Sequence, residues 1–99
     1  AKLDYEGSII IDEELMKAAN IKEYEKVLVA NFTNGNRYET YVLKGKSGSG
    51  IISVNGAGAR YSCTGDKITI FAFALVDENE KVNPWIVIVD ERNKIKKIV

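Results

Sequence analysis

The sequence contains no histidine, and this absence limits its chemistry more than any other feature of the composition. A chain without histidine cannot run a Ser-His-Asp or Cys-His mechanism, and it lacks the commonest zinc ligand. The only cysteine, Cys63, has no partner for an internal disulfide, and it cannot build a structural zinc site alone. A single cysteine is typical of a cytoplasmic protein. Any catalytic electrophile or nucleophile must therefore come from another residue type.

Net charge and long apolar runs are missing as well. Fourteen Lys and Arg residues balance fourteen Asp and Glu residues, so no net field attracts a nucleic acid or an anionic membrane. No apolar run approaches the roughly twenty residues of a membrane helix, and we expect neither a membrane span nor a signal peptide. The 99 residues, 45% of them hydrophobic, predict one domain whose small core would benefit from assembly into an oligomer.

The pattern that is present is a series of short apolar strands separated by turns. It predicts a mainly β barrel with two small helices. The expected strands cover residues 8–11, 27–32, 37–43, 51–54, 67–76, 85–89 and 94–99. The pair Asn34-Gly35 favours a type I′ hairpin turn between the second and third of these strands.

A short helix is expected directly after the first strand. Asp12 is a good N-cap, Glu13 and Glu14 suit the positive end of the helix dipole, and Asn20 can end the helix in the left-handed conformation. A metal site made of the same three carboxylates is the alternative. Capping is favoured because it already explains their positions.

The glycine-rich segment 45–50 invites comparison with a phosphate-binding loop. A P-loop needs Lys and then Ser or Thr directly after its second glycine, whereas Gly50 is followed by Ile51 and Ile52. We expect a hairpin connection here.

Three stretches carry side chains that together are unusual for a purely structural role. Tyr5-Glu6-Gly7-Ser8 places a hydroxyl residue after a glycine at the start of a strand. The segment 37–41 sets Arg37, Thr40 and Tyr41 on one expected strand. Asn55-Gly56-Ala57 offers an amide and backbone N–H groups, which are the usual components of an oxyanion hole.

With these stretches the sequence resembles the pyruvoyl-dependent aspartate 1-decarboxylase family. The matching segments are residues 3–9, 11–16, 24–27, 34–35, 37, 39–42, 52–57, 65–66 and 87–91. The resemblance implies a double-psi β-barrel with short helices. It also implies a homotetramer in the cytoplasm, with active sites between subunits.

The resemblance also implies an activity that needs no histidine. Members of the family are zymogens that cleave themselves, here between Gly7 and Ser8, and turn the serine into a pyruvoyl group. Residues 1–7 would then remain as the end of a β-subunit and residues 8–99 would form the α-subunit. The pyruvoyl group forms a Schiff base with L-aspartate, and this lyase releases CO2 and β-alanine for pantothenate and coenzyme A biosynthesis. The implied cofactor is this pyruvoyl group alone, with no metal.

The site residues follow from the match position by position. Ser8 and Tyr41 are the expected catalytic residues, with Tyr41 as proton donor. The residues expected to act in self-processing are Gly7, Ser8, Thr40 and Asn55. The residues expected to bind or surround the substrate are Arg37, Gly56, Ala57 and Tyr5, with the guanidinium of Arg37 on a carboxylate. Strand alternation sets Arg37 and Tyr41 on one face and Thr40 on the other, so Thr40 requires a bulge, a local twist or a neighbouring subunit's site.

Two departures from the family pattern leave alternatives open. The family begins with a further strand, carrying a lysine and a histidine, before the position that matches Ala1, so we expect a barrel one strand short. A run of alanines in the family reads Ala57-Gly58-Ala59 here, which predicts a slightly looser turn. The alternative to an enzyme is a processing-incompetent barrel that acts as a binding or regulatory module. The need for a maturation factor as a further partner is left open.

Overall fold

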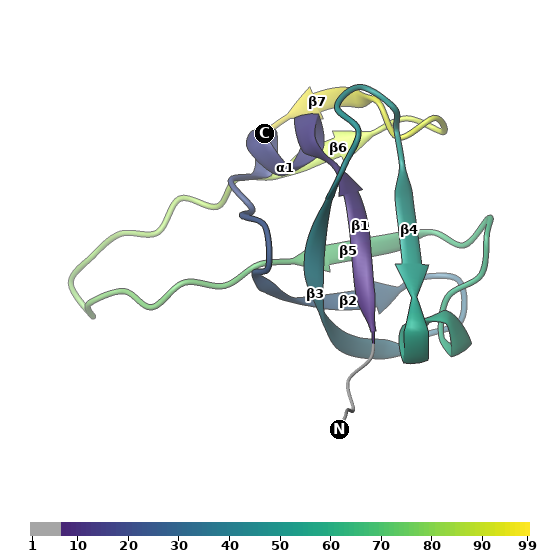
Figure 1. Ribbon diagram of the computed structural model, residues 1–99. Coiled ribbons are helices and arrows are strands. Elements are labelled where there is room, and N and C mark those ends of the chain that lie inside the picture. The colour runs from purple at the N-terminus through teal and green to yellow at the C-terminus, as the bar shows by residue number, and fades with distance from the viewer. Residues whose placement is uncertain (1–6) are drawn as a thin grey trace.

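The computed structural model describes residues 7–99, and in this part a curled sheet of five strands is the main feature (Figure 1). The strand order is β4-β1-β3-β2-β5, and a separate hairpin contains β6 and β7. The strands are β1 (Ser8–Asp12), β2 (Lys26–Asn31), β3 (Arg37–Gly45), β4 (Ile52–Asn55), β5 (Ile68–Phe71), β6 (Val87–Val89) and β7 (Ile95–Ile98). The predicted mainly β fold is confirmed, and the curl of the sheet is consistent with a double-psi β-barrel.

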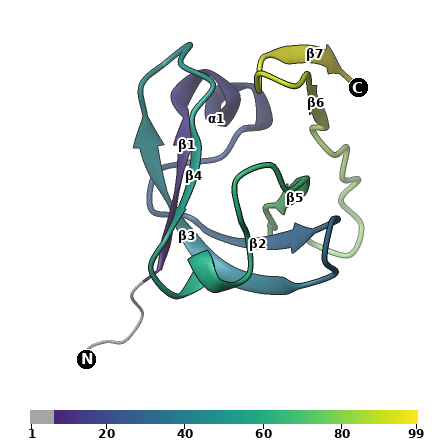
Figure 2. The same ribbon diagram turned by 90° about the vertical axis from the view of Figure 1, so that its right-hand side faces the viewer.

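The core lies between the curled sheet and one short helix. Its buried apolar side chains are Ile9, Ile11, Leu15, Met16, Val27, Val29 and Val42. Most of them are β-branched residues of β1, β2 and β3, which suits a pleated surface packed on one side. In Figure 2 the helix α1 (Glu13–Ala19) and the β6–β7 hairpin lie at one end of the sheet, and the 3-10 helix η1 (Gly56–Arg60) lies at the other.

Strand β3 holds the sheet together because it pairs with two different strands along its length. Its first half is antiparallel to β2, from Ala30 opposite Arg37 to Lys26 opposite Tyr41. Its second half is parallel to β1, beginning with Ile9 opposite Val42. The change of partner between Tyr41 and Val42 marks the place where the sheet curls.

The helix forms as its sequence predicts. Asp12 Oδ1 accepts a hydrogen bond of 2.8 Å from the backbone N–H of Glu14, and Asn20 ends the helix with a φ of 57°. Leu15 and Met16 are the buried residues of the helix. In residues 7–99 no group of three or more Asp, Glu, Cys or His side chains is arranged to hold a metal ion. No helix in this part of the chain is long and apolar enough to cross a membrane.

The predicted type I′ turn at Asn34-Gly35 is wrong. That turn needs a positive φ at both central residues, and of the two only Gly35 has one, at 81°. The side chain of Asn31 explains the wider loop, because its Oδ1 accepts from the backbone N–H groups of Thr33 and Asn34.

Two other local predictions differ from the structure. The glycine segment 45–50 is not a hairpin, because β3 and β4 both pair with β1 and not with each other. The expected strand over residues 67–76 is paired only as far as Phe71, which lies opposite Leu28. Beyond this pair β2 has only Val27 and Lys26 left, and residues 72–86 extend away from the barrel as an arm (Figure 1).

Candidate active site

An open cavity of about 480 Å³ lies beside the first residues of β1, at the end of the sheet where η1 is found. The residues that line it are Gly7, Lys26, Tyr38, Glu39, Thr40, Tyr41, Ala57, Gly58 and Tyr61. They come from β2, β3, the start of β1 and the turn after β4. Four of the residues that the sequence predicted for the site, Gly7, Thr40, Tyr41 and Ala57, therefore meet at one cavity.

The Gly7-Ser8 peptide lies at the edge of this cavity. Ser8 is the first residue of β1, it is buried, and its partner across the antiparallel β1–β4 pair is Asn55. A Cβ built on Gly7 would lie 3.4 Å from the carbonyl oxygen of Asn55. This is an ordinary van der Waals distance, so Gly7 lies in contact with the turn after β4 without being crowded by it.

Thr40 and Tyr41 both line the cavity although strand alternation predicts opposite faces. They are the last residues of β3 that pair with β2, just before the strand begins to pair with β1. We attribute their shared position to the twist at this change of partner, since the β2–β3 register continues without a shift. Thr40 Oγ1 is buried, and within residues 7–99 it has no hydrogen-bond partner.

The turn after β4 supplies a backbone N–H group to the cavity. Gly56 has a φ of 71°, a conformation that favours glycine, and it begins the 3-10 helix. The N atoms of Ala57 and Gly58 would lie 3.7 and 3.6 Å from a Cβ on Gly7. In a 3-10 helix that begins at Gly56, the N–H of Gly58 makes the first bond, to the carbonyl oxygen of Asn55. The N–H of Ala57 precedes that bond, so it is available to a charged oxygen near Gly7.

The remaining predicted residues lie farther away. Asn55 is exposed and lies opposite Ser8, but neither Asn55 nor Gly56 is part of the cavity lining. Arg37, at the exposed start of β3, is also outside that lining. Tyr5 lies outside the described residues.

The sequence did not predict a site role for five of the residues that line this cavity, which are Gly58 and the four described next. Lys26 and Glu39 form an ion pair of 3.2 Å at its rim, where both side chains are largely exposed. Tyr38 and Tyr61 form one wall, with stacked rings whose centroids are 5.6 Å apart. The alternation of β3 gave a signal for Tyr38, which shares a face with Thr40, but nothing local pointed to Tyr61.

A buried asparagine fixes the position of that aromatic wall. Asn31 Nδ2 donates to the carbonyl oxygen of Tyr61 at 2.9 Å and to Asp66 Oδ2 at 2.7 Å. The backbone N–H of Cys63 also donates to Asp66, and these hydrogen bonds hold the pKa of Asp66 below its ordinary value. The segment after η1 is thereby tied to the end of β2.

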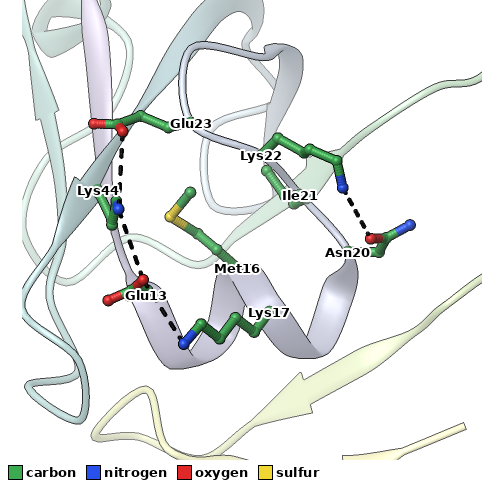
Figure 3. Close-up of a pocket in the computed structure, with 8 residues that line it drawn as sticks. All are labelled: Glu13, Met16, Lys17, Asn20, Ile21, Lys22, Glu23 and Lys44. Carbon is green, nitrogen blue, oxygen red and sulfur yellow. Dashed lines mark hydrogen bonds and ion pairs between the residues drawn. The ribbon is translucent and has the colours of Figure 1, made fainter.

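A second hollow, of about 340 Å³, lies beside α1 and is shown in Figure 3. Its floor is Met16, and its charged rim is already paired, because Lys44 lies 3.8 Å from Glu13 and 4.0 Å from Glu23. Lys17 also pairs with Glu13, at 3.8 Å. These groups satisfy one another, so the cavity at Gly7 is the better candidate for chemistry.

Comparison with known proteins identifies the family of this chain. The family model described as Aspartate decarboxylase matches residues 1–96. The chain belongs to the aspartate decarboxylase family. The aspartate 1-decarboxylase of Caldicellulosiruptor bescii is 57% identical over 100 residues, which cover 99% of this chain and 78% of the relative.

Other aspartate decarboxylases are similarly close. The aspartate 1-decarboxylase of Ralstonia nicotianae is 51% identical over 99% of this chain and 83% of its own length. That of Coprothermobacter proteolyticus is 48% identical over 97% of this chain and 80% of its own length. The resemblance seen in the sequence is therefore confirmed, as is the prediction that the chain is an enzyme of this family.

Proposed function

We propose that this aspartate decarboxylase cleaves itself between Gly7 and Ser8 and then converts L-aspartate to β-alanine and CO2. The observation that carries the proposal is the buried Thr40 hydroxyl without a partner in residues 7–99, at a cavity that Gly7 also lines. Burying a hydroxyl without a hydrogen bond costs about 1–3 kcal/mol. Such a cost is typical of a functional site, where a hydroxyl forms its hydrogen bond only with a reacting group.

The cleavage begins with a rearrangement of the Gly7-Ser8 peptide. Ser8 Oγ attacks the carbonyl carbon of Gly7, an ester bond forms, and the amide C–N bond breaks as its nitrogen takes up a proton. The negative charge on the carbonyl oxygen is stabilised by the backbone N–H of Ala57 and by the amide of Asn55. Thr40 Oγ1 can donate a hydrogen bond to the same oxygen.

Elimination and hydrolysis complete the reaction. The Cα proton of residue 8 is removed, the Cβ–Oγ bond breaks, and Gly7 leaves with a carboxylate. Residue 8 is then dehydroalanine, and water replaces its nitrogen, which leaves as ammonia. The chain becomes two pieces, residues 1–7 and residues 8–99, and the second begins with a pyruvoyl group.

The residues at the cavity fit a group of this size and chemistry. Ser8 is buried at the head of β1, and unpaired donors from Thr40 and the η1 turn suit a small carbonyl-bearing group. A pyruvoyl group held there would supply a ketone that can hold the substrate amine and act as the electron acceptor for decarboxylation. Tyr41 would deliver the proton to the product carbon, and Arg37 would bind a substrate carboxylate.

The exposed position of Arg37 supports a site completed between subunits. We propose a homotetramer, because several large apolar side chains of residues 72–86 are exposed in the single chain. They are Phe73, Leu75, Val76, Val82, Trp85 and Ile86. The cytoplasmic location, the maturation factor and the role in pantothenate biosynthesis stay predictions of the sequence.

Intact-mass spectrometry of the purified protein during warm incubation tests the proposal. We expect a fragment that ends at Gly7 and a larger one that starts with a pyruvoyl group, with β-alanine formed from L-aspartate in parallel. Ser8→Ala should remain one uncleaved, inactive chain. Ser47→Ala, which removes an exposed hydroxyl from the 46–51 loop, is the matched control and should cleave normally.

Two outcomes contradict the proposal. Turnover of aspartate by Ser8→Ala would show that residue 8 is not the source of the electrophile. A chain that stays intact after prolonged incubation would favour a non-catalytic barrel.

A further inference from the structure

Gly58 packs against two side chains that would have to shift to admit a larger residue. It is buried, and a Cβ built on it would lie 2.9 Å from Val54 Cγ1 and 3.0 Å from Tyr38 Cε2. Gly58 does not have a positive φ, so the backbone conformation alone does not demand glycine. The lack of a side chain therefore serves to bring the η1 turn into contact with the Tyr38 ring. The sequence predicted a loosened turn at this glycine, whereas the structure has a closely packed one.

The Tyr38 ring is itself held on two sides. Its hydroxyl lies 2.6 Å from Ser62 Oγ, and its face stacks on Tyr61. Ser62 Oγ and the backbone carbonyl of Tyr61 both accept from Asn31 Nδ2. The ring is thus a fixed support and not a mobile surface side chain.

The other side of the same turn faces the peptide that is cleaved. The N atoms of Ala57 and Gly58 are the close backbone neighbours of Gly7, as described above. A displacement of Gly58 away from Tyr38 would therefore move the free N–H of Ala57 relative to the Gly7 carbonyl. Reactions that depend on aligned donors lose rate steeply when the donors move by as little as 1 Å.

We propose that Tyr38 is a positioning residue for self-processing, which seats the η1 turn against Gly7 through its contact with Gly58. The inference rests on the proposed cleavage and adds to it the residue that sets the geometry of the oxyanion donors. Tyr38 and Gly58 act as a pair: the ring packs against the glycine, and the glycine places the N–H of Ala57. Ser62 and Tyr61 keep the ring in place.

The test is a double-mutant cycle read by the rate of cleavage. Gly58→Ala should slow cleavage by about ten- to a hundredfold, because the new methyl group meets the Tyr38 ring and pushes the turn away. Adding Tyr38→Leu should restore most of that loss, since the smaller side chain leaves room for the methyl group. Complementary changes in volume can also restore stability, so the melting temperatures of all three variants are compared with their cleavage rates. A positioning role requires the loss and the recovery of rate to be larger than any change in stability accounts for.

Tyr38→Phe gives a milder variant that keeps the ring and the fold. It removes the hydrogen bond to Ser62, and we expect cleavage to slow by about fivefold, the equivalent of one hydrogen bond. Tyr24→Phe is the matched control, because Tyr24 is exposed, lies outside the cavity lining and should cleave at the original rate. The melting temperature of each variant is measured alongside the rate.

Hydrogen exchange in the Ser8→Ala background gives a readout that does not need cleavage. The peptide covering residues 55–61 should exchange faster with Gly58→Ala or Tyr38→Phe, and Tyr38→Leu should slow it again in the Gly58→Ala chain. An unchanged cleavage rate in Gly58→Ala, or the absence of rescue, overturns the inference, as does unaltered exchange. If the parent chain never cleaves, the proposed function fails, and the exchange measurements alone decide the role of Tyr38.

Discussion

At the scale of single residues, Asp12 does more than its sequence context predicts. It is the N-cap of α1, but its carboxylate also accepts from the backbone N–H groups of Gly48 at 2.9 Å and Gly50 at 2.7 Å. Burial alone would raise the pKa of Asp12; the N–H groups of Gly50, Gly48 and Glu14, together with the charge of Lys94, outweigh it and lower the pKa below 3.8. One buried carboxylate thus joins the end of β1 to the 46–51 loop.

This gives a prediction about acid stability. A carboxyl group with a lowered pKa in the folded state stabilises the protein above its ordinary pKa, and the stabilisation disappears as the pH falls through the lowered value. Asp12→Asn should reduce the free energy of unfolding at pH 7 by about 1–3 kcal/mol, because an amide accepts fewer of the three N–H groups. Below pH 4 the difference from the parent chain should shrink. Urea unfolding at pH 7 and pH 3 measures this, and a gap that widens in acid would contradict it.

Some residues of the candidate site could be predicted from the sequence, and others could not. Gly7, Ser8, Thr40 and Tyr41 belong to motifs that are continuous in the sequence, so a family resemblance reveals them. The contact between Tyr38 and Gly58 joins positions twenty residues apart on different elements, and no local pattern encodes it. The sequence therefore predicts chemical groups better than it predicts the residues that hold them in place.

At the scale of elements, the strands and the helix were largely predictable, but their pairing was not. Alternation and capping residues are local signals, and they located β1, α1 and the two halves of the β2–β3 hairpin. That β3 changes partner after Tyr41 depends on the parallel strand β1, which is far away in the sequence. This change of partner is what lets Thr40 and Tyr41 line the same cavity.

Substitutions of two glycines with similar φ angles test whether the 46–51 loop is held against the turn between β6 and β7. Gly50 has a φ of 73°, and a Cβ on it would lie 2.4 Å from the carbonyl oxygen of Arg92, in the turn between β6 and β7. Gly35 has a φ of 81° and no atom within 4 Å of such a Cβ. Gly35→Ala should therefore cost only the left-handed backbone penalty, about 1–2 kcal/mol. Gly50→Ala adds a clash with backbone and should cost at least about 2 kcal/mol more.

The comparison is made by chemical unfolding of both variants under the same conditions. Equal losses in the free energy of unfolding would show that the turn between β6 and β7 moves away freely from the 46–51 loop. That result would also count against the hydrogen bond of 2.9 Å from Asn93 Nδ2 to the Gly50 carbonyl as a fixed link between the two segments.

At the scale of the whole molecule, the exposed arm of residues 72–86 is the feature that favours the proposed assembly. Leu75 is fully exposed, and Phe73 and Trp85 are 70% and 62% exposed, on a segment that pairs with no strand of residues 7–99. Isolated apolar side chains on a surface are ordinary, but several on one extended segment are typical of an interface. Arg37 and the open cavity would gain neighbours by the same assembly.

Replacing apolar side chains of the arm with charged ones should therefore disrupt assembly and activity together. We expect the parent protein to have a mass in solution four times that of the 11.0 kDa chain, measured by light scattering after size-exclusion chromatography. Leu75→Glu combined with Trp85→Lys should shift the mass toward that of one chain, because charged side chains at a buried interface cost more than the contacts return. Glu78→Gln, on the same arm but already polar, is the matched control and should remain assembled. A variant that loses its assembly and still decarboxylates aspartate at the parent rate would mean that each chain holds a complete site. Arg37 would then have to act without a neighbouring subunit.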